Sequence, residues 1–559
     1  MGLARSTFCE NPEHSADDTA IVESMAAVCD EFEHYGWRRV RAALRQQGLI
    51  VNHNKFRRLM REHDLQPATR RRFIATTQSR STDLSQSRPS SRRYSLMGAC
   101  LFPCDCGYKR HTNHNWSCHF MDRIAAPREV DKTLFAPDAA SSETKYGLPS
   151  EIRYCKRCVI SNQRPNSAVE YSHTKASKKS TIHFDEEGIC DACRFAERKN
   201  GSIDWADRDR MLRELCDRHR SKDGSYDCIL PGSGGKDSFY ASHILRKEYG
   251  MHPLTVTWAP HVYTEWGWRN FQRWIHAGHD NMLMTPNGQV HRLLTRLAVD
   301  LLFHPFQAFM FGQKSLAPKM ALLHKIPLVF YGENEAEYGN PIGDTDTAKR
   351  DWSYFTAADQ SKVYLGGVSI ADLKGQFGLE HQDLLPYLPA DPNKIEEVGV
   401  EVHYLGFYKK WHPQGAYYYA VEHGGFEASP ERTPGTYSKY NSIDDRIDDF
   451  HYYTTGTKFG IGRASYDAAQ EIRSGEISRD EGVALVKRFD HEYPQRFAQE
   501  IFDYLSIPAT EFSEASKMFE QPVMDSEYFR KLTDNFRSPH LWKWDGANWS
   551  LRQPIWATP

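Results

Sequence analysis

Short apolar runs alternate with amphipathic stretches along the chain from about Tyr146 onward. Four of the runs have the length of strands, at 229–230, 254–258, 281–284 and 327–331. The stretches between them carry apolar residues at helical spacing. Strands that alternate with helices indicate an α/β fold built on a doubly wound parallel sheet.

Residues 1–80 form a separate block with a helical pattern. Gly48 and Asn52 separate two short predicted helices, whose apolar residues recur at helical spacing: Val40, Leu44, Phe56, Leu59 and Met60. Eleven Lys and Arg side chains lie between Tyr35 and Phe73, opposed only by Glu62 and Asp64. The block is either a basic helix–turn–helix suited to DNA phosphates or a small helical hairpin with a solvated basic face.

The run 35–73, YGWRRVRAALRQQGLIVNHNKFRRLMREHDLQPATRRRF, resembles the helical DNA-binding segment of IS3-type insertion-sequence transposases. Nothing after residue 80 resembles the acidic catalytic core of such an enzyme. The resemblance therefore implies a vestigial transposase fragment, residues 1–80, fused to another protein. Nucleic acid is expected as a partner through this segment alone.

Residues 81–147 are predicted to be a linker, poorly ordered for the most part, because the stretch begins rich in Ser and Arg and without periodicity. Cysteines and histidines crowd together further along it: Cys104, Cys106, His111, His114 and Cys118. A second metal site is an open alternative there, although the C-x-C and H-x-x-H spacings are not those of a regular finger.

Composition narrows the class of protein. The 559 residues carry 71 basic and 73 acidic side chains, a net charge of −2, so no global field favours nucleic acid or a membrane as the partner. No window holds the roughly 18 apolar residues of a membrane-spanning helix, and the first residues lack the apolar core expected of a secretory signal. All twelve cysteines lie in the first 228 residues, unlike a disulfide framework, which favours a reducing cytoplasmic location.

Two cysteine pairs have metal-ligand spacing. Cys155 and Cys158 form one C-x-x-C pair, and Cys190 and Cys193 form a second one 31 residues later. Two such turns complete a tetrahedral sulfur site for structural zinc, and a zinc ribbon is predicted over 148–205. The alternatives are four buried thiols without a metal, or redox pairs.

A strand, a glycine-rich loop and a helix follow one another from 226 to about 249. The loop reads GSGGKDS from Gly232 to Ser238 and is not a Walker A motif. Backbone N–H groups of such a loop and the positive end of the helix dipole form an anion cradle. The alternative is a glycine-rich turn without a ligand.

The letters SGGKDS resemble the PP-loop of the ATP pyrophosphatases, with a Rossmann-like fold predicted over 206–360. The resemblance implies that ATP is held by the loop residues Ser233, Gly234, Gly235, Lys236, Asp237 and Ser238. Thr257 and Gly332 are also expected near ATP, because they stand at the carboxyl ends of predicted strands, where such sheets bind ligands. The resemblance also implies Mg²⁺ on Asp237. Glu333, which follows the strand at 327–331, is a natural second carboxylate for Mg²⁺ or else a helix N-terminal charge. Lys236, Asp237 and Glu333 are therefore the predicted catalytic residues.

The segment from about Tyr146 to Trp556 resembles the N-acetyl sugar amidotransferases of bacterial O-antigen and pseudaminic-type pathways. The motifs that carry the resemblance are YCKRCVI, CDAC, SGGKDS, GHDNMLMTPNGQVHR, YGENEAEYG and TKFGIGRASYDAAQEIR. The family implies that ATP adenylates the oxygen of an acetamido group on a nucleotide-linked sugar. Ammonia then displaces AMP and leaves an acetamidine.

Substrate contacts are expected from Asn334, Lys458 and Arg463, the last two within the mainly helical part predicted over 361–559. Surface charges at a helix entry are the alternative for Lys458 and Arg463. No cysteine suited to glutamine hydrolysis is identified, so the chain is not expected to make its own ammonia from glutamine. The family resemblance implies that partners similar to glutaminase and cyclase subunits supply the ammonia. A PP-loop tRNA-modifying or other adenylating ligase remains the alternative enzyme, and a DNA-binding protein the alternative of another class.

Overall fold

The computed structural model describes residues 18–31, 40, 44, 49, 51–63, 65, 122–139, 143–166, 171–340 and 347–557. The chain divides into two compact units, 1–113 and 114–559. The possible second metal site at Cys104, Cys106, His111, His114 and Cys118 lies outside the described residues.

The smaller unit is helical. Helices α1 (Thr19–Glu31) and α3 (His53–Glu62) contribute to one apolar core that includes Met25, Val40, Leu44, Phe56 and Leu59. An ion pair between Lys55 and Asp18 at 2.5 Å joins the start of α1 to α3. The side chains of Arg57, Arg58 and Arg61 remain exposed on α3. The helical spacing in the sequence thus gives a buried apolar face and a basic outer face.

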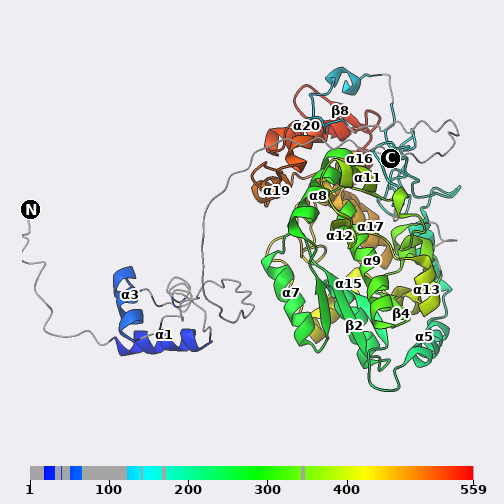
Figure 1. Ribbon diagram of the computed structural model, residues 1–559. Coiled ribbons are helices and arrows are strands. Elements are labelled where there is room, and N and C mark those ends of the chain that lie inside the picture. Colours follow the sequence, from blue (N-terminus) through cyan, green and yellow to red (C-terminus); the bar gives the residue numbers. More distant parts are fainter. Residues whose placement is uncertain are drawn as a thin grey trace, which may run out of the picture. The chain divides into compact units, whose positions relative to one another are not determined.

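The larger unit is built on a five-stranded sheet, with the order β3-β2-β1-β4-β7 and every pair parallel (Figure 1). Its strands are β1 (Cys228–Pro231), β2 (Pro253–Trp258), β3 (Asn281–Met284), β4 (Leu328–Tyr331) and β7 (Glu401–Tyr404). The chain adds β2 and β3 on one side of β1 and then returns to add β4 and β7 on the other. The order of strands therefore reverses between β1 and β4, where α/β sheets bind ligands.

Helices cover both faces of this sheet, as the predicted doubly wound fold requires. Ile229, Val329 and Val402 face a core that they share with α8 (Gly288–Leu302) and α9 (Gln307–His324). Their neighbours Leu230 and Phe330 face the opposite core. The helices on that side are α5 (Trp205–His219), α6 (Lys236–Lys247), α7 (Glu265–His276) and α15 (Pro413–Gly424). Alternation along β1, β4 and β7 thus buries the sheet on both sides, whereas Met282 and Leu283 of the edge strand β3 are exposed.

The remaining elements precede the sheet, connect its strands or form the C-terminal helical part. Helix α4 (Asp191–Gly201) begins at the second cysteine pair and contains Cys193. Between β4 and β7 lie the hairpin of β5 (Tyr364–Leu365) and β6 (Val368–Ser369) and the helices α11 (Ile370–Gly375), α12 (His381–Leu384) and α13 (Pro392–Val398). Helix α14 (Leu405–Tyr408) directly follows β7. The helical part contains α16 (Asp448–Phe459), α17 (Arg463–Ser474), α18 (Arg479–Phe489), α19 (Ala498–Leu505) and α20 (Ser526–Phe536), followed by the hairpin β8 (Trp542–Trp544) and β9 (Trp549–Leu551).

The fifth strand, β7, has no counterpart among the predicted strands. Its sequence is Glu-Val-His-Tyr, with Val402 as its only aliphatic residue. It lies at an edge of the sheet, and its polar side chains have local partners: His403 contacts Tyr408 Oη at 2.8 Å and Glu401 at 3.2 Å. Short polar edge strands carry little hydrophobic pattern. The sheet therefore extends beyond the predicted 206–360 segment.

Part of the predicted poorly ordered linker is also ordered. Ile124 forms a bridge with Phe519, donating to the carbonyl of Met518 at 2.7 Å and accepting from Glu520 N at 2.9 Å. Phe135 is buried against Trp549, with ring centroids 4.9 Å apart. Residues 122–139 and 143–147 thus pack on the C-terminal part, which sequence periodicity alone does not reveal.

Candidate active site

The glycine-rich loop leaves the carboxyl end of β1 and enters α6. Gly234 has φ of 83°, and a Cβ built on it would lie 2.5 Å from Phe271 Cα and 2.8 Å from Phe271 N. A Cβ on Gly232 would lie 2.3 Å from Ser238 Cβ. These two positions need glycine because of close packing, and at Gly234 also because of the left-handed backbone. Gly235 is the N-cap of α6, so the free N–H groups of the helix start face the loop.

Replacing Gly234 by alanine (G234A) is expected to lower the free energy of unfolding by about 2 kcal/mol or more. The left-handed backbone costs a non-glycine residue about 1–2 kcal/mol, and displacement of the α7 backbone adds to that cost. Chemical denaturation of the full chain measures the change. G201A is the matched control, because a Cβ on Gly201 meets nothing within 4 Å. Equal stability of G234A and G201A would contradict this account of the loop.

The first two residues of α6 carry the charges of the site. Lys236 Nζ lies 2.5 Å from Asp237 Oδ2, and Trp411 Nε1 donates to Asp237 Oδ1 at 3.1 Å. Lys236 is 7% exposed, so its ammonium group is largely withdrawn from water. The lysine lies where the anion cradle needs a positive charge, and both oxygens of Asp237 are oriented by donors.

A second carboxylate reaches the same place from the carboxyl end of β4. Gly332 passes close to α6, and Glu333 follows it, with Glu333 Oε2 accepting from Tyr338 Oη at 2.5 Å. Burial, and next to it the charge of Asp237, raise the pKa of Glu333 to about 7. Two carboxylates that repel each other in a buried site form an arrangement that a bound cation would stabilise.

Two adjoining cavities meet at this point. The first, here called the loop chamber, has a volume of about 330 Å³ and is lined by Ser233, Gly234 and Gly235. The second, here called the outer chamber, has a volume of about 560 Å³ and is lined by Arg164, Lys458 and Arg463. The residues common to both are Lys236, Asp237, Met310, Gln313, Glu333, Ser442, His451 and Tyr452. The predicted catalytic residues Lys236, Asp237 and Glu333 are all among them.

The predicted substrate residues divide into two groups. Lys458 and Arg463 line the outer chamber, and both have partners: Lys458 Nζ donates to Leu302 O at 2.7 Å, and Arg463 Nε lies 3.2 Å from Asp467. Asn334 lines neither chamber. Its side chain caps a short helix by accepting from Ala336 N at 3.1 Å. The structure thus gives Asn334 a local structural contact in place of the predicted contact with substrate.

Three predicted ATP residues lie near the chambers without lining them. Thr257 is buried in β2, with its hydroxyl accepting from Asn281 at 2.9 Å. Ser238 Oγ donates to the Gly235 carbonyl at 3.0 Å, which fixes the loop. Gly332 allows β4 to approach α6, since a Cβ there would lie 3.3 Å from the Asp237 carbonyl. Ser238 and Gly332 thus shape the loop and its approach to β4, whereas the contact of Thr257 lies within the sheet.

Several residues that line the chambers are not among those predicted from the sequence. Asp444, Asp445 and Asp448 come from the segment NSIDDRIDDF before and within α16, and His451 follows one turn later. Burial raises the pKa of Asp444 and of Asp448 above the usual range. Asp445 is bound to His261 Nδ1 at 2.7 Å and ties down the loop after β2. The dense run of aspartates was the one signal in the sequence.

The four predicted zinc ligands lie together in a buried cluster. The Sγ atoms of Cys155 and Cys193 are 3.8 Å apart and those of Cys158 and Cys190 are 3.7 Å apart. A disulfide would need about 2.05 Å. A tetrahedron with metal–sulfur bonds of about 2.3 Å has edges of about 3.8 Å, so the sulfurs match a single ion. The backbone N–H groups of Arg157 and Cys190 each point at Cys155 Sγ, at 3.4 Å.

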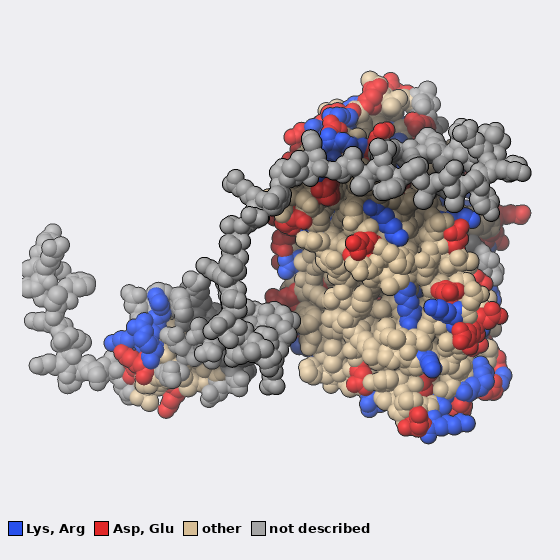
Figure 2. All heavy atoms as spheres, viewed as in Figure 1, with Lys and Arg blue, Asp and Glu red and all other residues tan. Residues whose placement is uncertain are grey.

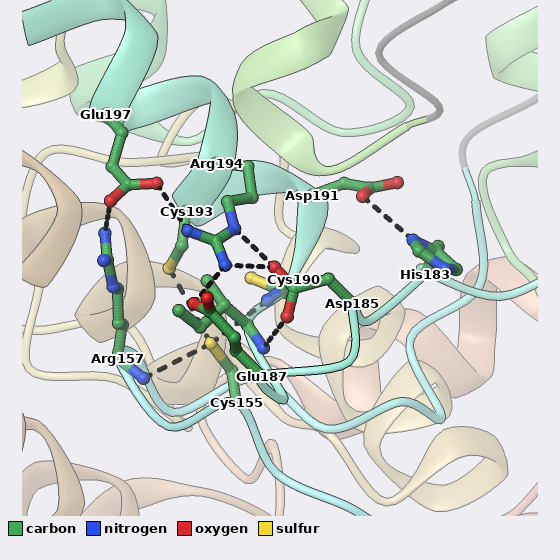
Figure 3. A network of polar contacts seen from close by, with 11 residues as sticks. Cys155, Arg157, His183, Asp185, Glu187, Cys190, Asp191, Cys193, Arg194 and Glu197 are labelled. Atoms are coloured by element: carbon green, nitrogen blue, oxygen red, sulfur yellow. Dashed lines mark hydrogen bonds and ion pairs between the residues drawn. The ribbon is translucent and has the colours of Figure 1, made fainter. Parts of the chain in front are cut away.

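Charged side chains surround the cluster (Figure 3). Arg194 on α4 contacts Asp185, Glu187 and Glu197, and Glu197 in turn contacts Arg157. These contacts join the two cysteine turns to the first turns of α4. These ion pairs are partly exposed, so they orient the segments of the ribbon but contribute little to its stability.

A buried ion pair connects the ribbon to the active site. Lys199 Nζ on α4 lies 2.7 Å from Glu337 Oε1 and donates to the Trp411 carbonyl at 3.1 Å. Glu337 directly precedes Tyr338, whose hydroxyl donates a hydrogen bond to Glu333. Trp411 donates a hydrogen bond to Asp237. The ribbon therefore supports both predicted Mg²⁺ ligands through one lysine.

Replacing Lys199 by methionine (K199M) is expected to lower the free energy of unfolding by about 3–5 kcal/mol, because Glu337 keeps a buried charge without a partner. Chemical denaturation of the full chain measures the loss. K517M is the matched control, since Lys517 pairs with Glu514 on the surface, where such a pair contributes about 0–1 kcal/mol. If K199M costs no more than K517M, the ion pair does not support the site as described.

The surface of the larger unit carries mixed charge. On the face drawn in Figure 2, Lys and Arg are interspersed with Asp and Glu, without a basic stripe. Within the part of the chain that the structure describes, no helix combines the length and the apolar character needed to cross a bilayer.

Comparisons with known proteins give two family matches. Residues 434–554 match the C-terminal domain of WbpG-like LPS biosynthesis proteins. Residues 16–73 match an HTH-like domain. The first match agrees with the predicted resemblance of the C-terminal part to enzymes of O-antigen pathways, and the second agrees with the helix–turn–helix predicted in residues 1–80. No curated protein matches.

Two solved structures are distantly similar. One is the U34-tRNA thiolase NcsA from Methanococcus maripaludis with its [4Fe-4S] cluster: 12% identity, TM-score 0.23, covering 60% of this chain and 88% of that one. The other is NMN synthetase from Francisella tularensis: 10% identity, TM-score 0.23, covering 55% of this chain and 98% of that one. Similarity at this level says nothing about what the present chain binds.

Proposed function

We propose that this chain is an ATP-dependent, AMP-forming amidotransferase that converts an acetamido group of a nucleotide-linked sugar into an acetamidine. The observation that carries the proposal is the junction of the two chambers at Lys236, Asp237 and Glu333. Much of the outer chamber is lined by residues of the segment similar to LPS biosynthesis proteins, among them Lys458, Arg463 and Tyr466. A phosphate-binding loop thus adjoins a polar cavity of the size of a small ligand.

ATP is proposed to lie in the loop chamber. The N–H groups at the start of α6 and the ammonium of Lys236 would hold its phosphates, and Ser233 would donate to them. Asp237 and Glu333 are the proposed ligands of Mg²⁺. Their fit rests on the raised pKa of Glu333, a carboxylate that loses its proton more readily beside a cation. The cation would neutralise charge on the leaving pyrophosphate.

The acetamido group is proposed to enter from the outer chamber. The amide oxygen attacks the α-phosphorus of ATP, a P–O bond to it forms, and the bond to pyrophosphate breaks. Lys236 then faces the charge that develops on the pyrophosphate. Trp411 and Tyr338 keep the two carboxylates in place during this step. Arg463 and Lys458 are proposed to face the polar groups of the sugar substrate.

Ammonia is proposed to come from partner subunits of the glutaminase and cyclase type. Among the described cysteines outside the cluster, Cys216 and Cys228 are buried, and burial raises the pKa of both thiols. Neither has the exposed, acidic thiol of a glutaminase nucleophile. The metal of the four-cysteine cluster is proposed to be zinc in a structural role, since four thiolates leave no open coordination position. The proposed location is cytoplasmic.

The test is to incubate the full chain with ATP, Mg²⁺, ammonium and acetamido sugars, free and nucleotide-linked, and to analyse the products by mass spectrometry. The expected result is AMP, pyrophosphate and a sugar that has lost one dalton, because NH replaces O. Glutamine in place of ammonium should give no product without a partner. Release of ADP, or transfer of sulfur or an adenylate to tRNA, would contradict the proposal.

DNA binding is a second proposed function, confined to the smaller unit and favoured by its HTH-like match and the exposed arginines of α3. The full chain should shift duplex DNA in a gel at low salt and release it at higher salt. R57A/R58A/R61A should abolish the shift, and a shift that persists in that variant would contradict this role.

A further inference from the structure

One face of α16 runs along both chambers. Asp448 lines the loop chamber, His451 and Tyr452 line both, and Thr455 lines the outer chamber. Their spacing of three, four and seven residues places them in one row on the helix. His451 is therefore at the junction, where an adenylated amide would have its reactive carbon.

The other polar residues at the junction have tasks already. Lys236, Asp237 and Glu333 serve the phosphates and the cation in the proposed function. Ser442 Oγ and Tyr452 Oη lie 2.9 Å apart and satisfy each other. Met310 and Gln313 have no basic group. Among the described residues that line both chambers, His451 is thus the one base without an assigned role.

The imidazole of His451 is held in place by packing rather than by hydrogen bonds. Its ring stacks on His304 at 5.1 Å and lies 5.0 Å from Phe306. Its Nδ1 atom is buried without a hydrogen-bond partner. The ring therefore has no hydrogen bond through Nδ1, while the residue lines both chambers.

Resting on the proposed function, we infer that His451 is the catalytic base that receives ammonia in the second half-reaction. Ammonia adds to the carbon of the adenylated amide, forming a C–N bond and a positively charged –NH₃⁺ group. His451 takes one proton from that group. The C–O bond to AMP then breaks, its electron pair leaves with the AMP oxygen, and the acetamidinium remains. The proton passes from His451 to solvent.

Burial and nearby cationic groups determine the protonation state of His451. Burial, followed by Arg463, Lys458 and His261, lowers the pKa of His451 to about 3. The imidazole is therefore neutral at physiological pH but a weak base, so its uptake of a proton requires that a bound anion raise this pKa. Lys236, Asp237 and Glu333 line the same two chambers, and His304 lies against its ring. The anionic phosphates of bound nucleotide would raise its basicity during the reaction.

The test separates the two half-reactions in the full chain. ATP–pyrophosphate exchange, dependent on the acetamido sugar, reports adenylation, and amidine formation from ammonium reports both steps. H451Q should keep exchange within about threefold of the unsubstituted chain. Amidine formation should fall by about a hundredfold to ten-thousandfold, the usual contribution of a general base. H276Q, on the exposed end of α7, is the matched control and should leave both unchanged.

Amidine formation by H451Q within about threefold of the unsubstituted chain would overturn the inference, as would an equal loss of both activities in the folded variant. If H451Q does not fold, H451N is measured against the same criteria. Exchange that is absent in the unsubstituted chain would instead refute the proposed function. The two failures are therefore distinguishable.

Discussion

Replacing Lys236 by methionine (K236M) is expected to reduce sugar-dependent ATP–pyrophosphate exchange by about a hundredfold or more. Lys236 is the one cation among the described residues that line the loop chamber, and removal of a single preorganised donor to developing charge costs about that much. Methionine keeps the length of the aliphatic stem, so the buried packing at the start of α6 is preserved. The exchange rate at saturating ATP and sugar measures the effect.

The control is K247M, on the same helix but exposed at its far end. It should exchange as fast as the unsubstituted chain. Because Lys236 also neutralises Asp237, thermal midpoints of both variants are needed to show that they are folded. If folded K236M exchanges within about threefold of K247M, the phosphates are not held where the loop chamber places them.

The loop could be found in the sequence because its determinants are local. Gly234 needs its left-handed backbone, Lys236 and Asp237 open the helix, and all of them lie within a few residues of a short buried strand. Glu333 could be predicted as a site residue because it follows a predicted strand, and ligands bind at the carboxyl ends of parallel strands. The structure places these residues around one chamber, between β1 and β4.

The remaining walls of the chambers come from segments far along the chain. Trp411 is 174 residues from the Asp237 that it contacts, and His451 reaches the junction from a helix of the C-terminal part. Which face of α16 turns inward depends on how that helix packs, and its sequence has no clear apolar face that would point to a site. Asn334 was predicted from its position but does not line a chamber. It directly follows Glu333, yet the turn after β4 directs its side chain to Ala336 N.

Replacing Cys158 by serine (C158S) is expected to have the largest effect on stability, since a structural zinc site contributes about 10–16 kcal/mol of apparent binding free energy to the fold that holds it. Cys158 is fully buried, and serine would leave three thiolates and a hydroxyl around the ion. Elemental analysis should find one zinc per unsubstituted chain and none per C158S. The ribbon should then unfold, and limited proteolysis should cleave between 150 and 200.

The consequence for activity follows from Lys199. When α4 is no longer anchored by Cys190 and Cys193, Lys199 is released from Glu337 and from the Trp411 carbonyl. Tyr338 and Trp411 then lose the support through which they hold Glu333 and Asp237. Pyrophosphate exchange should therefore disappear together with the zinc, although no cysteine lines either chamber.

The matched control is C216A, a buried thiol of α5 outside the cluster, which should keep its zinc and its exchange activity. Reductants should not restore C158S, because the paired sulfurs lie 3.7–3.8 Å apart, too far for disulfides, and the proposed link between them is a metal. A C158S chain that retains exchange without zinc would show that the ribbon and the active site are independent. In that case the contact of Lys199 with Glu337 would be local packing, and the ribbon would need another explanation.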